Sequence, residues 1–401
     1  MAVRTIPGGL LAPKGWTAAG TCAHVKGSTG DKLDVGLLAS DYDCAAAGVF
    51  TQNHFQAAPV QYSKRHLPSR NVRAIVADSG NANACTGEQG LRDAELMART
   101  AAELIGVDAS QVLVGSTGVI GIPMPMDRIV PAIRSLQLGP HGDAFNEAIM
   151  TTDTKRKQHA VALEVAGREV RVGGVTKGAA MIHPNMATML CFVTSDAAVD
   201  PAVLDGVVKH AANRSFNTLS IDGDQSTNDT LIVMCNGAAG NDPIRPGTPE
   251  AALLGQAIEA VCLDLARQMA GDAEGGNKVI EVHVSGAVSD EQALIAARKI
   301  VSSTLLKCAV HGNDPNWGRI LMALGNSPVK VDERLVATSI QAVRMMERGA
   351  PVPFDAAAAS KAMDAPLVTI EVELGLGSGK GLAVGCDMSE EYVTLNADYT
   401  T

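Results

Sequence analysis

The order in which strand-like and helix-like segments follow one another constrains the fold of this 401-residue chain most strongly. Short apolar runs and alternating apolar and polar residues predict strands, and apolar residues three and four positions apart predict helices. The strands expected in this way are residues 72–77, 111–114, 189–193, 367–373 and 391–396. They do not alternate strictly with helices, so we expect an α+β architecture of mixed sheets sandwiched by helices, and not a doubly wound dinucleotide fold.

Local signals predict four of the helices. Apolar residues recur at helical spacing over residues 90–105. Asp200 and Thr248 each stand directly before a proline, so each is expected to cap a helix whose first turn loses nothing by the missing N–H. Ser289 and Gln292 form a capping box for a further helix.

The composition is that of a globular protein with an acidic balance. Hydrophobic residues make up 46% of the chain, charged residues 19%, and the formal net charge is −10. Phosphate does not attract a negative surface, and only 3% of residues are aromatic, so we expect no nucleic-acid partner. No run approaches the roughly 20 apolar residues that span a bilayer, and no secretory signal is visible. We therefore expect no membrane partner and a cytoplasmic location.

Cysteine and histidine spacing bears on redox state and metals. The eight cysteines include no C-x-x-C pair, and disulfide frameworks are typical of short secreted chains, so we expect reduced thiols. The nine histidines include no H-E-x-x-H or other close ligand spacing. We therefore expect no metal site.

The glycine-rich stretch GLGSGKG at residues 375–381 looks like a phosphate-binding loop. However, Leu374 stands where such a loop needs its first glycine, and no serine or threonine follows Lys380 to hold a magnesium ion. Strand-like residues lie on both sides of it. We interpret the stretch as a hairpin turn.

The densest chemistry lies in the segment KGAAMIHPNMATML at residues 177–190. Turn formers precede the apolar run, so Thr188 is expected at the first residue of a buried strand. A threonine hydroxyl is a weak nucleophile unless a base adjoins it, and cutting the peptide bond before Thr188 would make its own α-amine that base. The ordinary pKa of an α-amine, about 7.7–8.0, suits a general base. Periodicity alone favours a simpler interpretation, in which Thr188 is only a β-branched strand residue.

The same segment resembles the signature of the ornithine acetyltransferase (glutamate N-acetyltransferase) family, the bifunctional arginine-biosynthesis proteins. Five further stretches resemble this family in the same order along the chain. They are GSTGVIG at 115–121, MTTDT at 150–154, GDAEG at 271–275, GNDPNWGR at 312–319 and NADYTT at 396–401. Ala180 departs from the glycine expected there, and an alanine would be strained if that position needs a positive φ.

The resemblance implies an acyltransferase that cleaves itself between Ala187 and Thr188. The products would be residues 1–187 and 188–401, which by the family pattern associate as an α2β2 heterotetramer. The new terminal Thr188 would take acetyl from N-acetylornithine and pass it to glutamate in a ping-pong cycle that needs no cofactor. In bifunctional members of the family, acetyl-CoA also serves as a donor.

The family's functional positions map onto single residues of this chain. By resemblance the nucleophile is Thr188, and Thr117 and Gly118 form the oxyanion hole. The substrate-binding positions are Thr151, Lys177, Thr188, Glu274, Asn396 and Thr401. From charge alone, Lys177 suits a substrate carboxylate and Glu274 suits the terminal ammonium of ornithine, although a surface ion pair is the commoner fate of such residues.

Other interpretations remain open at this point. A self-processing N-terminal-nucleophile hydrolase, such as an aminopeptidase or amidase, would share Thr188 but transfer the acyl group to water. A scaffold protein would keep one intact chain. Asp78 and Asp222 are candidate bases that nothing in the sequence places near Thr188. Residues that we expect to serve as scaffold or turn are Asp314, Asn316 and Arg319.

Overall fold

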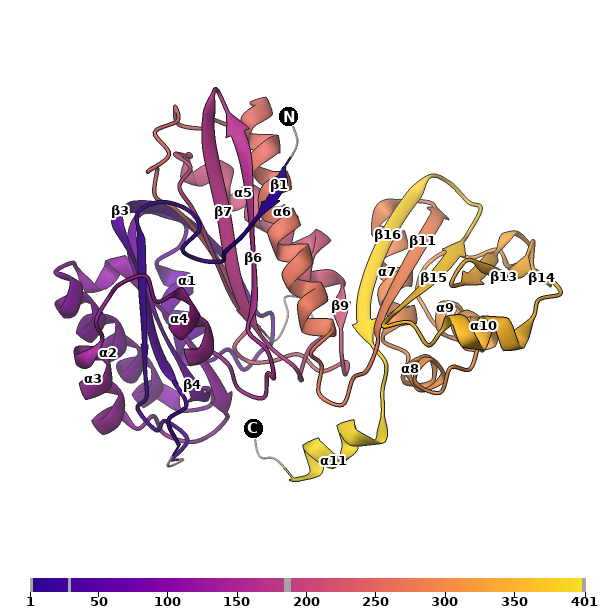
Figure 1. Ribbon diagram of the computed structural model, residues 1–401, viewed down its shortest axis with the longest axis horizontal. Coiled ribbons are helices and arrows are strands. Elements are labelled where there is room, and N and C mark those ends of the chain that lie inside the picture. The colour runs from indigo at the N-terminus through magenta and orange to yellow at the C-terminus, as the bar shows by residue number, and fades with distance from the viewer. Residues whose placement is uncertain (1–2, 28–29, 184–188, 399–401) are drawn as a thin grey trace.

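The computed structural model describes residues 3–27, 30–183 and 189–398, and these form two lobes that stand side by side (Figure 1). The first lobe is built on a nine-stranded sheet and the second on a seven-stranded sheet. Helices pack against both sheets, which confirms the expected α+β class. Within the described ranges, no helix has the length and apolar character that a membrane crossing requires.

The sheet of the first lobe runs in the order β1, β6, β7, β8, β10, β3, β4, β5, and β2 pairs with β3. β8 is parallel to β10 and β4 to β5, whereas the other neighbours are antiparallel. The strands are β1 (Arg4–Ile6), β2 (Trp16–Thr21), β3 (Val35–Phe50), β4 (Ser69–Asn81), β5 (Val112–Val119), β6 (Lys157–Val165), β7 (Arg168–Lys177), β8 (Leu190–Ser195) and β10 (Thr230–Cys235).

Helices flank this sheet on two sides. Helices α1 to α3 form one core with β2 to β5, and α5 and α6 form another with β6 to β8 and β10. Their bounds, with those of two 3₁₀ turns, are α1 (Ala58–Arg65), α2 (Gly87–Ile105), η1 (Ala109–Gln111), α3 (Met126–Ser135), α4 (Gly142–Ala148), α5 (Pro201–Arg214), η2 (Phe216–Thr218) and α6 (Pro249–Ala270).

The long strand β3 allows the sheet to fold into two facing layers. Its first half pairs with β2 and β4 and its second half with β10, and the register shifts between Ala39 and Cys44. Along β8, Leu190 and Phe192 pack against β3, β4 and β5, whereas the side chains between and after them pack against α5 and α6. The first lobe is therefore a sandwich of helices, two sheet layers and helices.

The second lobe is a smaller unit with its own core. Its sheet runs in the order β14, β13, β12, β15, β11, β16, β9. The elements are β9 (Leu219–Ser220), β11 (Val279–Ala287), α7 (Asp290–Val301), α8 (Thr304–His311), α9 (Trp317–Gly325), η3 (Glu333–Leu335), β12 (Ala337–Ile340), β13 (Val343–Glu347), β14 (Ala350–Pro351), α10 (Ala356–Ala362), β15 (Leu367–Glu373) and β16 (Gly379–Cys386). The last helix, α11 (Glu390–Asp398), leaves this lobe and extends back toward the first (Figure 1). In the sequence, the short strand β9 directly follows α5 and η2 of the first lobe. It pairs with β16 of the second lobe and so connects the two lobes.

The predicted helix starts are confirmed. The Asp200, Thr248 and Ser289 side chains accept hydrogen bonds from backbone N–H groups of the first turns of α5, α6 and α7. The predicted helix at 90–105 is α2. The three caps act within one helical turn, so they can be recognised from neighbouring residues alone.

Two predictions about connections and the tail are wrong. Residues 375–381 do not form a hairpin, because β11 lies between β15 and β16 and pairs with both. Residues 391–396 form part of α11 and not a strand. The Ser389 hydroxyl accepts a hydrogen bond from the Glu391 N–H and two glutamates stand in the first turn, which favours a helix where no sheet edge is available.

Candidate active site

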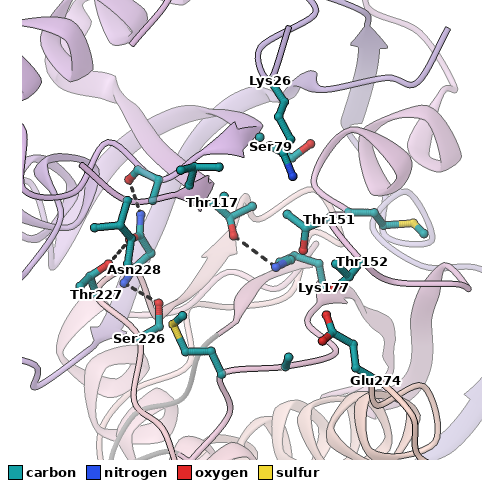
Figure 2. Close-up of a pocket in the computed structure, with 18 of the residues that line it drawn as sticks. Lys26, Ser79, Thr117, Thr151, Thr152, Lys177, Ser226, Thr227, Asn228 and Glu274 are labelled. Carbon is teal, nitrogen blue, oxygen red and sulfur yellow. Dashed lines mark hydrogen bonds between the residues drawn. The ribbon is translucent and has the colours of Figure 1, made fainter. Parts of the chain in front are cut away.

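A cavity of about 500 Å³ lies at the end of the first lobe's sheet. Figure 2 draws residues that line it, and α11, which contributes Tyr392 and Asn396 to the lining, is labelled in Figure 1. The structure brings the predicted site residues that it describes together around this cavity. These are Thr117, Gly118, Thr151, Lys177, Glu274 and Asn396. Ala187, Thr188 and Thr401 lie outside the described residues.

Thr117 and Gly118 stand near the end of β5, where the strand comes close to β4. A Cβ on Gly118 would lie 2.3 Å from the carbonyl carbon of Gly80, and the φ of Gly118 is +134°. Only glycine fits such a position. The strand predicted at residues 72–77 continues as far as Asn81 in β4, because residues 78–81 pair with β5.

Lys177 is the last residue of β7 and is 5% exposed. Its Nζ donates a hydrogen bond of 3.2 Å to Thr117 Oγ1, drawn as a dashed line in Figure 2. Burial lowers the pKa of Lys177, and the nearby Asp153 carboxylate opposes that effect. The buried amino group of Lys177 therefore lies directly beside the hydroxyl of the predicted oxyanion hole.

Glu274 follows α6 and faces the cavity from another wall (Figure 2). Its backbone N–H donates to the Ala179 carbonyl at 2.9 Å, and its Oε2 accepts a hydrogen bond of 2.9 Å from Asn396 Nδ2 on α11. Oε1 is shielded from solvent and has no hydrogen-bond partner within the described part of the chain. A buried carboxylate oxygen of this kind requires a donor, which a bound ammonium group can supply.

Thr151 lies in the loop that precedes β6. Its N–H donates to Asp153 Oδ2 at 3.0 Å, and its carbonyl accepts a hydrogen bond of 2.6 Å from Lys32 Nζ. The loop is thereby held against the cavity wall, and Lys32 also lines the cavity.

Two aspartates hold the chain on either side of the predicted cleavage site. Asp222 accepts hydrogen bonds from the N–H groups of Met181 and Ile182, the latter at 2.8 Å. Asp229 Oδ1 accepts one of 3.1 Å from the Met189 N–H. Burial raises the pKa of Asp222, and the hydrogen bonds that its carboxylate accepts from backbone N–H groups oppose this effect. These contacts show Asp222 holding the backbone of Met181 and Ile182, a few residues before the predicted cleavage site.

The positive φ angles of this segment fall at Gly178 and Met181 and not at Ala180. Ala180 therefore does not need the positive φ that glycine tolerates best. The strain considered for Ala180 does not arise in this structure.

Sequence reasoning missed several residues that line the cavity: Lys26, Lys32, Asp34, Asn228 and Tyr392. Asn228 had a usable signal, because it stands two residues before β10 in the sequence, as the predicted nucleophile stands two residues before β8, and these two strands are parallel neighbours. Its Nδ2 donates to the carbonyls of Ala82 and Ser116 at 2.6 and 2.8 Å, which fixes the end of β5.

The remaining residues singled out in the sequence lie elsewhere. Asp78 is a fully buried residue of β4 and does not line the cavity. Asp314 and Asn316 hydrogen-bond to each other at 3.0 Å between α8 and α9 of the second lobe. Arg319 donates to the Leu305 carbonyl at 2.6 Å. These contacts agree with the scaffold interpretation.

The cavity is that of an enzyme for a small charged molecule, since a buried lysine beside a hydroxyl faces it from one wall, and a carboxylate oxygen that finds no donor among the described residues faces it from another. The chain belongs to the ArgJ family, whose model matches residues 17–401.

Individual relatives agree with this family over the whole chain. An arginine biosynthesis bifunctional protein ArgJ from Symbiobacterium thermophilum is 48% identical over 399 residues, with 99% of each chain covered. The protein of that name from Gloeobacter violaceus is 45% identical over 402 residues, with 99% of this chain and 98% of that chain covered. A crystal structure of the Bacillus halodurans protein is 40% identical with a TM-score of 0.51, and covers 52% of this chain and 98% of its own.

Family membership confirms the resemblance that the sequence motifs indicate. The chain is an acyltransferase of arginine biosynthesis, and this activity is favoured over the hydrolase and scaffold alternatives.

Proposed function

We propose that this chain transfers the acetyl group of N-acetylornithine to glutamate, releasing ornithine and forming N-acetylglutamate. The observation that carries the proposal is the charge pattern of one cavity, in which Lys177 and Glu274 stand on different walls. N-acetylornithine has a carboxylate and a terminal ammonium. Lys177 matches the carboxylate, and Glu274 Oε1, which has no donor among the described residues, matches the ammonium.

The oxyanion of the acyl transfer would be stabilised at Thr117 and Gly118. Because Lys177 Nζ donates to Thr117 Oγ1, the hydroxyl proton is directed to a different acceptor, and the neighbouring cation makes that proton a stronger donor. The Gly118 N–H would be the second donor. A single such donor typically contributes about 3–4 kcal/mol to the transition state.

The nucleophile in this proposal is Thr188, released by self-cleavage. Its hydroxyl attacks the carbonyl carbon of Ala187, the C–N bond breaks, and the resulting ester is hydrolysed by water, which leaves residues 1–187 and an amino-terminal Thr188. Two observations support this step. Asp222 and Asp229 hold the backbone on both sides of the cleaved bond, and the solved Bacillus halodurans chain spans about half of this one.

In the transfer cycle, the Thr188 hydroxyl attacks the acetyl carbon and the α-amine takes its proton. Ornithine leaves with that proton, and an acetyl ester remains on the enzyme. The glutamate amine then attacks this ester and restores the hydroxyl. The proposal needs no cofactor, and it includes acetyl-CoA as a second donor to the same hydroxyl. Its finer parts include an α2β2 assembly of the two products in the cytoplasm, and the eight free cysteines support that location.

Initial rates test the transfer. When one substrate is varied at several fixed concentrations of the other, double-reciprocal plots should be parallel, because ornithine leaves before glutamate binds. Ornithine should also compete with glutamate for the acetyl-enzyme. Intersecting lines would show that both substrates are bound together, and would contradict the ping-pong cycle.

A further inference from the structure

Three residues proposed to contact substrate come from three separate segments, and one buried lysine outside the cavity links all three. Lys157 is the first residue of β6, is 1% exposed and does not line the cavity. Its Nζ lies 2.6 Å from Asp153 Oδ1 and 2.5 Å from Asp272 Oδ2. Its ammonium therefore joins two buried carboxylates.

The Asp153 carboxylate connects Lys157 to two of the binding segments. Its Oδ2 accepts a hydrogen bond of 3.0 Å from the Thr151 N–H. Its Oδ1 accepts one of 2.7 Å from the Gly178 N–H, directly after Lys177. The loop that carries Thr151 and the strand end that carries Lys177 are thus attached to one carboxyl group.

The Asp272 carboxylate connects Lys157 to the third segment. Asp272 stands two residues after the end of α6 and two residues before Glu274. It accepts hydrogen bonds from the hydroxyl and the N–H of Thr154 and from the Lys155 N–H, the two N–H contacts being 3.0 and 3.3 Å long. The segment that carries Glu274 is thereby fixed to the same loop.

Charge makes the lysine necessary. Burial alone would raise the pKa of Asp153, but Lys177, Lys157 and the Gly178 N–H hold it at about 2, so the carboxylate is ionised at neutral pH. An apolar side chain at position 157 would leave two buried carboxylates without the cation between them. Such carboxylates move apart or take up water, which displaces the segments attached to them.

We propose that Lys157 is a positioning residue for substrate recognition, which sets the spacing of Thr151, Lys177 and Glu274 without touching the substrate. This inference rests on the proposed function, because it takes the cavity to bind ornithine. This role differs from a general contribution to stability. Substitution of Lys157 should reduce ornithine affinity more than an equally destabilising substitution elsewhere in the chain.

The test measures ornithine binding to the processed protein by titration calorimetry, with kcat and KM for N-acetylornithine measured in parallel. Lys157→Met and Asp272→Asn should each weaken ornithine binding and raise KM about tenfold or more, and Asp272→Asn, which alters the segment that carries Glu274, should change kcat less than threefold. Lys157→Arg, which keeps the charge, should restore most of the affinity. Asp196→Asn is the matched control, because this buried carboxylate ties the Lys14 and Arg171 N–H groups together after the far end of β8.

Wild-type affinity in Lys157→Met, or an equal loss of affinity in Asp196→Asn, would overturn the proposal. If Lys157→Met yields no folded protein, Asp272→Asn decides the matter by the same two outcomes. Failure of the proposed function looks different, because the wild-type protein itself would then bind no ornithine.

Discussion

At the scale of single residues, Lys177 can act in two ways: through its hydrogen bond to Thr117 and through its own charge. The ammonium is buried and its hydrogen bond goes to the hydroxyl oxygen, so Lys177 acts on the reaction through Thr117 as well as through its own charge. Glu274 differs, because one of its oxygens is held by Asn396 and the other has no partner in the described chain. Lys177 and Thr117 should therefore affect the chemical step, whereas Glu274 and Asn396 should affect substrate binding.

Thr117→Ala should lower kcat by about 10²–10³ and change KM much less, because an oxyanion exists only along the reaction path. The measurement is steady-state acetyl transfer from N-acetylornithine to glutamate. Thr117→Ser, which keeps the hydroxyl, is the control and should retain most of the activity. An alanine variant with wild-type kcat would remove Thr117 from the oxyanion hole.

Glu274→Gln should raise KM for N-acetylornithine about tenfold or more, because a neutral amide no longer attracts the terminal ammonium and a hydrogen bond to a charged group contributes about 1.5–3 kcal/mol. KM for glutamate, which has no such ammonium, should change much less. Glu274→Asp retains the charge and serves as the control. Equal changes for both substrates would argue against the assigned partner.

At the scale of elements, the predictable part of the fold is the part that depends on neighbouring residues. The starts of α5, α6 and α7 follow from Asp200, Thr248 and Ser289, since a cap acts within one turn. The course of residues 78–81 could not be predicted, because those residues are strand only by pairing with β5. The helix α11 was mistaken for a strand because an alternating pattern says nothing about whether a sheet edge is available.

The site was predictable to a similar extent and for a similar reason. Motif resemblance singles out Thr117, Lys177 and Glu274, and all three line one cavity. It could not identify Lys157, whose contact with Asp272 joins residues 115 positions apart in the sequence. Contacts of that separation follow from the fold as a whole and leave no local pattern.

Truncation before Glu390 tests the role of α11 as a wall of the cavity. The helix supplies Asn396 and Tyr392 to the lining, and its side chains are mostly exposed. Its loss should therefore raise KM for N-acetylornithine about tenfold or more, because Glu274 Oε2 loses its donor, and should change the melting temperature little. Kinetics and thermal unfolding of the truncated protein, with Asn396→Ala for comparison, provide the measurement. An unchanged KM would show that α11 is dispensable for binding.

At the scale of the whole molecule, one buried carboxyl group should limit stability as the pH rises. Burial raises the pKa of Asp78 well above its ordinary value of 3.8; the Ser116 hydroxyl opposes this and the Asp34 carboxylate adds to it. Between the ordinary and the raised pKa, the folded chain holds a proton that the unfolded chain has lost. The contribution of Asp78 to the free energy of unfolding therefore falls as the pH rises above about 4.

Asp78→Asn should remove that dependence. The free energy of unfolding of the variant minus that of the wild type should therefore be larger at pH 7 than at pH 4. Denaturant unfolding of both proteins at the two pH values gives the comparison, with pH 4 as the internal control. The opposite sign would mean that Asp78 is ionised in the folded chain.

The account as a whole depends on an acetyl group that resides on Thr188 between the two half-reactions. Mass spectrometry of the protein incubated with N-acetylornithine alone tests this directly, with uncleaved Thr188→Ala as the control. We predict a fragment that begins at Thr188, gains the mass of one acetyl group at that residue, and returns to its original mass when glutamate is added, as N-acetylglutamate appears. An intact chain, or an acetyl group lost equally fast without glutamate, would contradict the account.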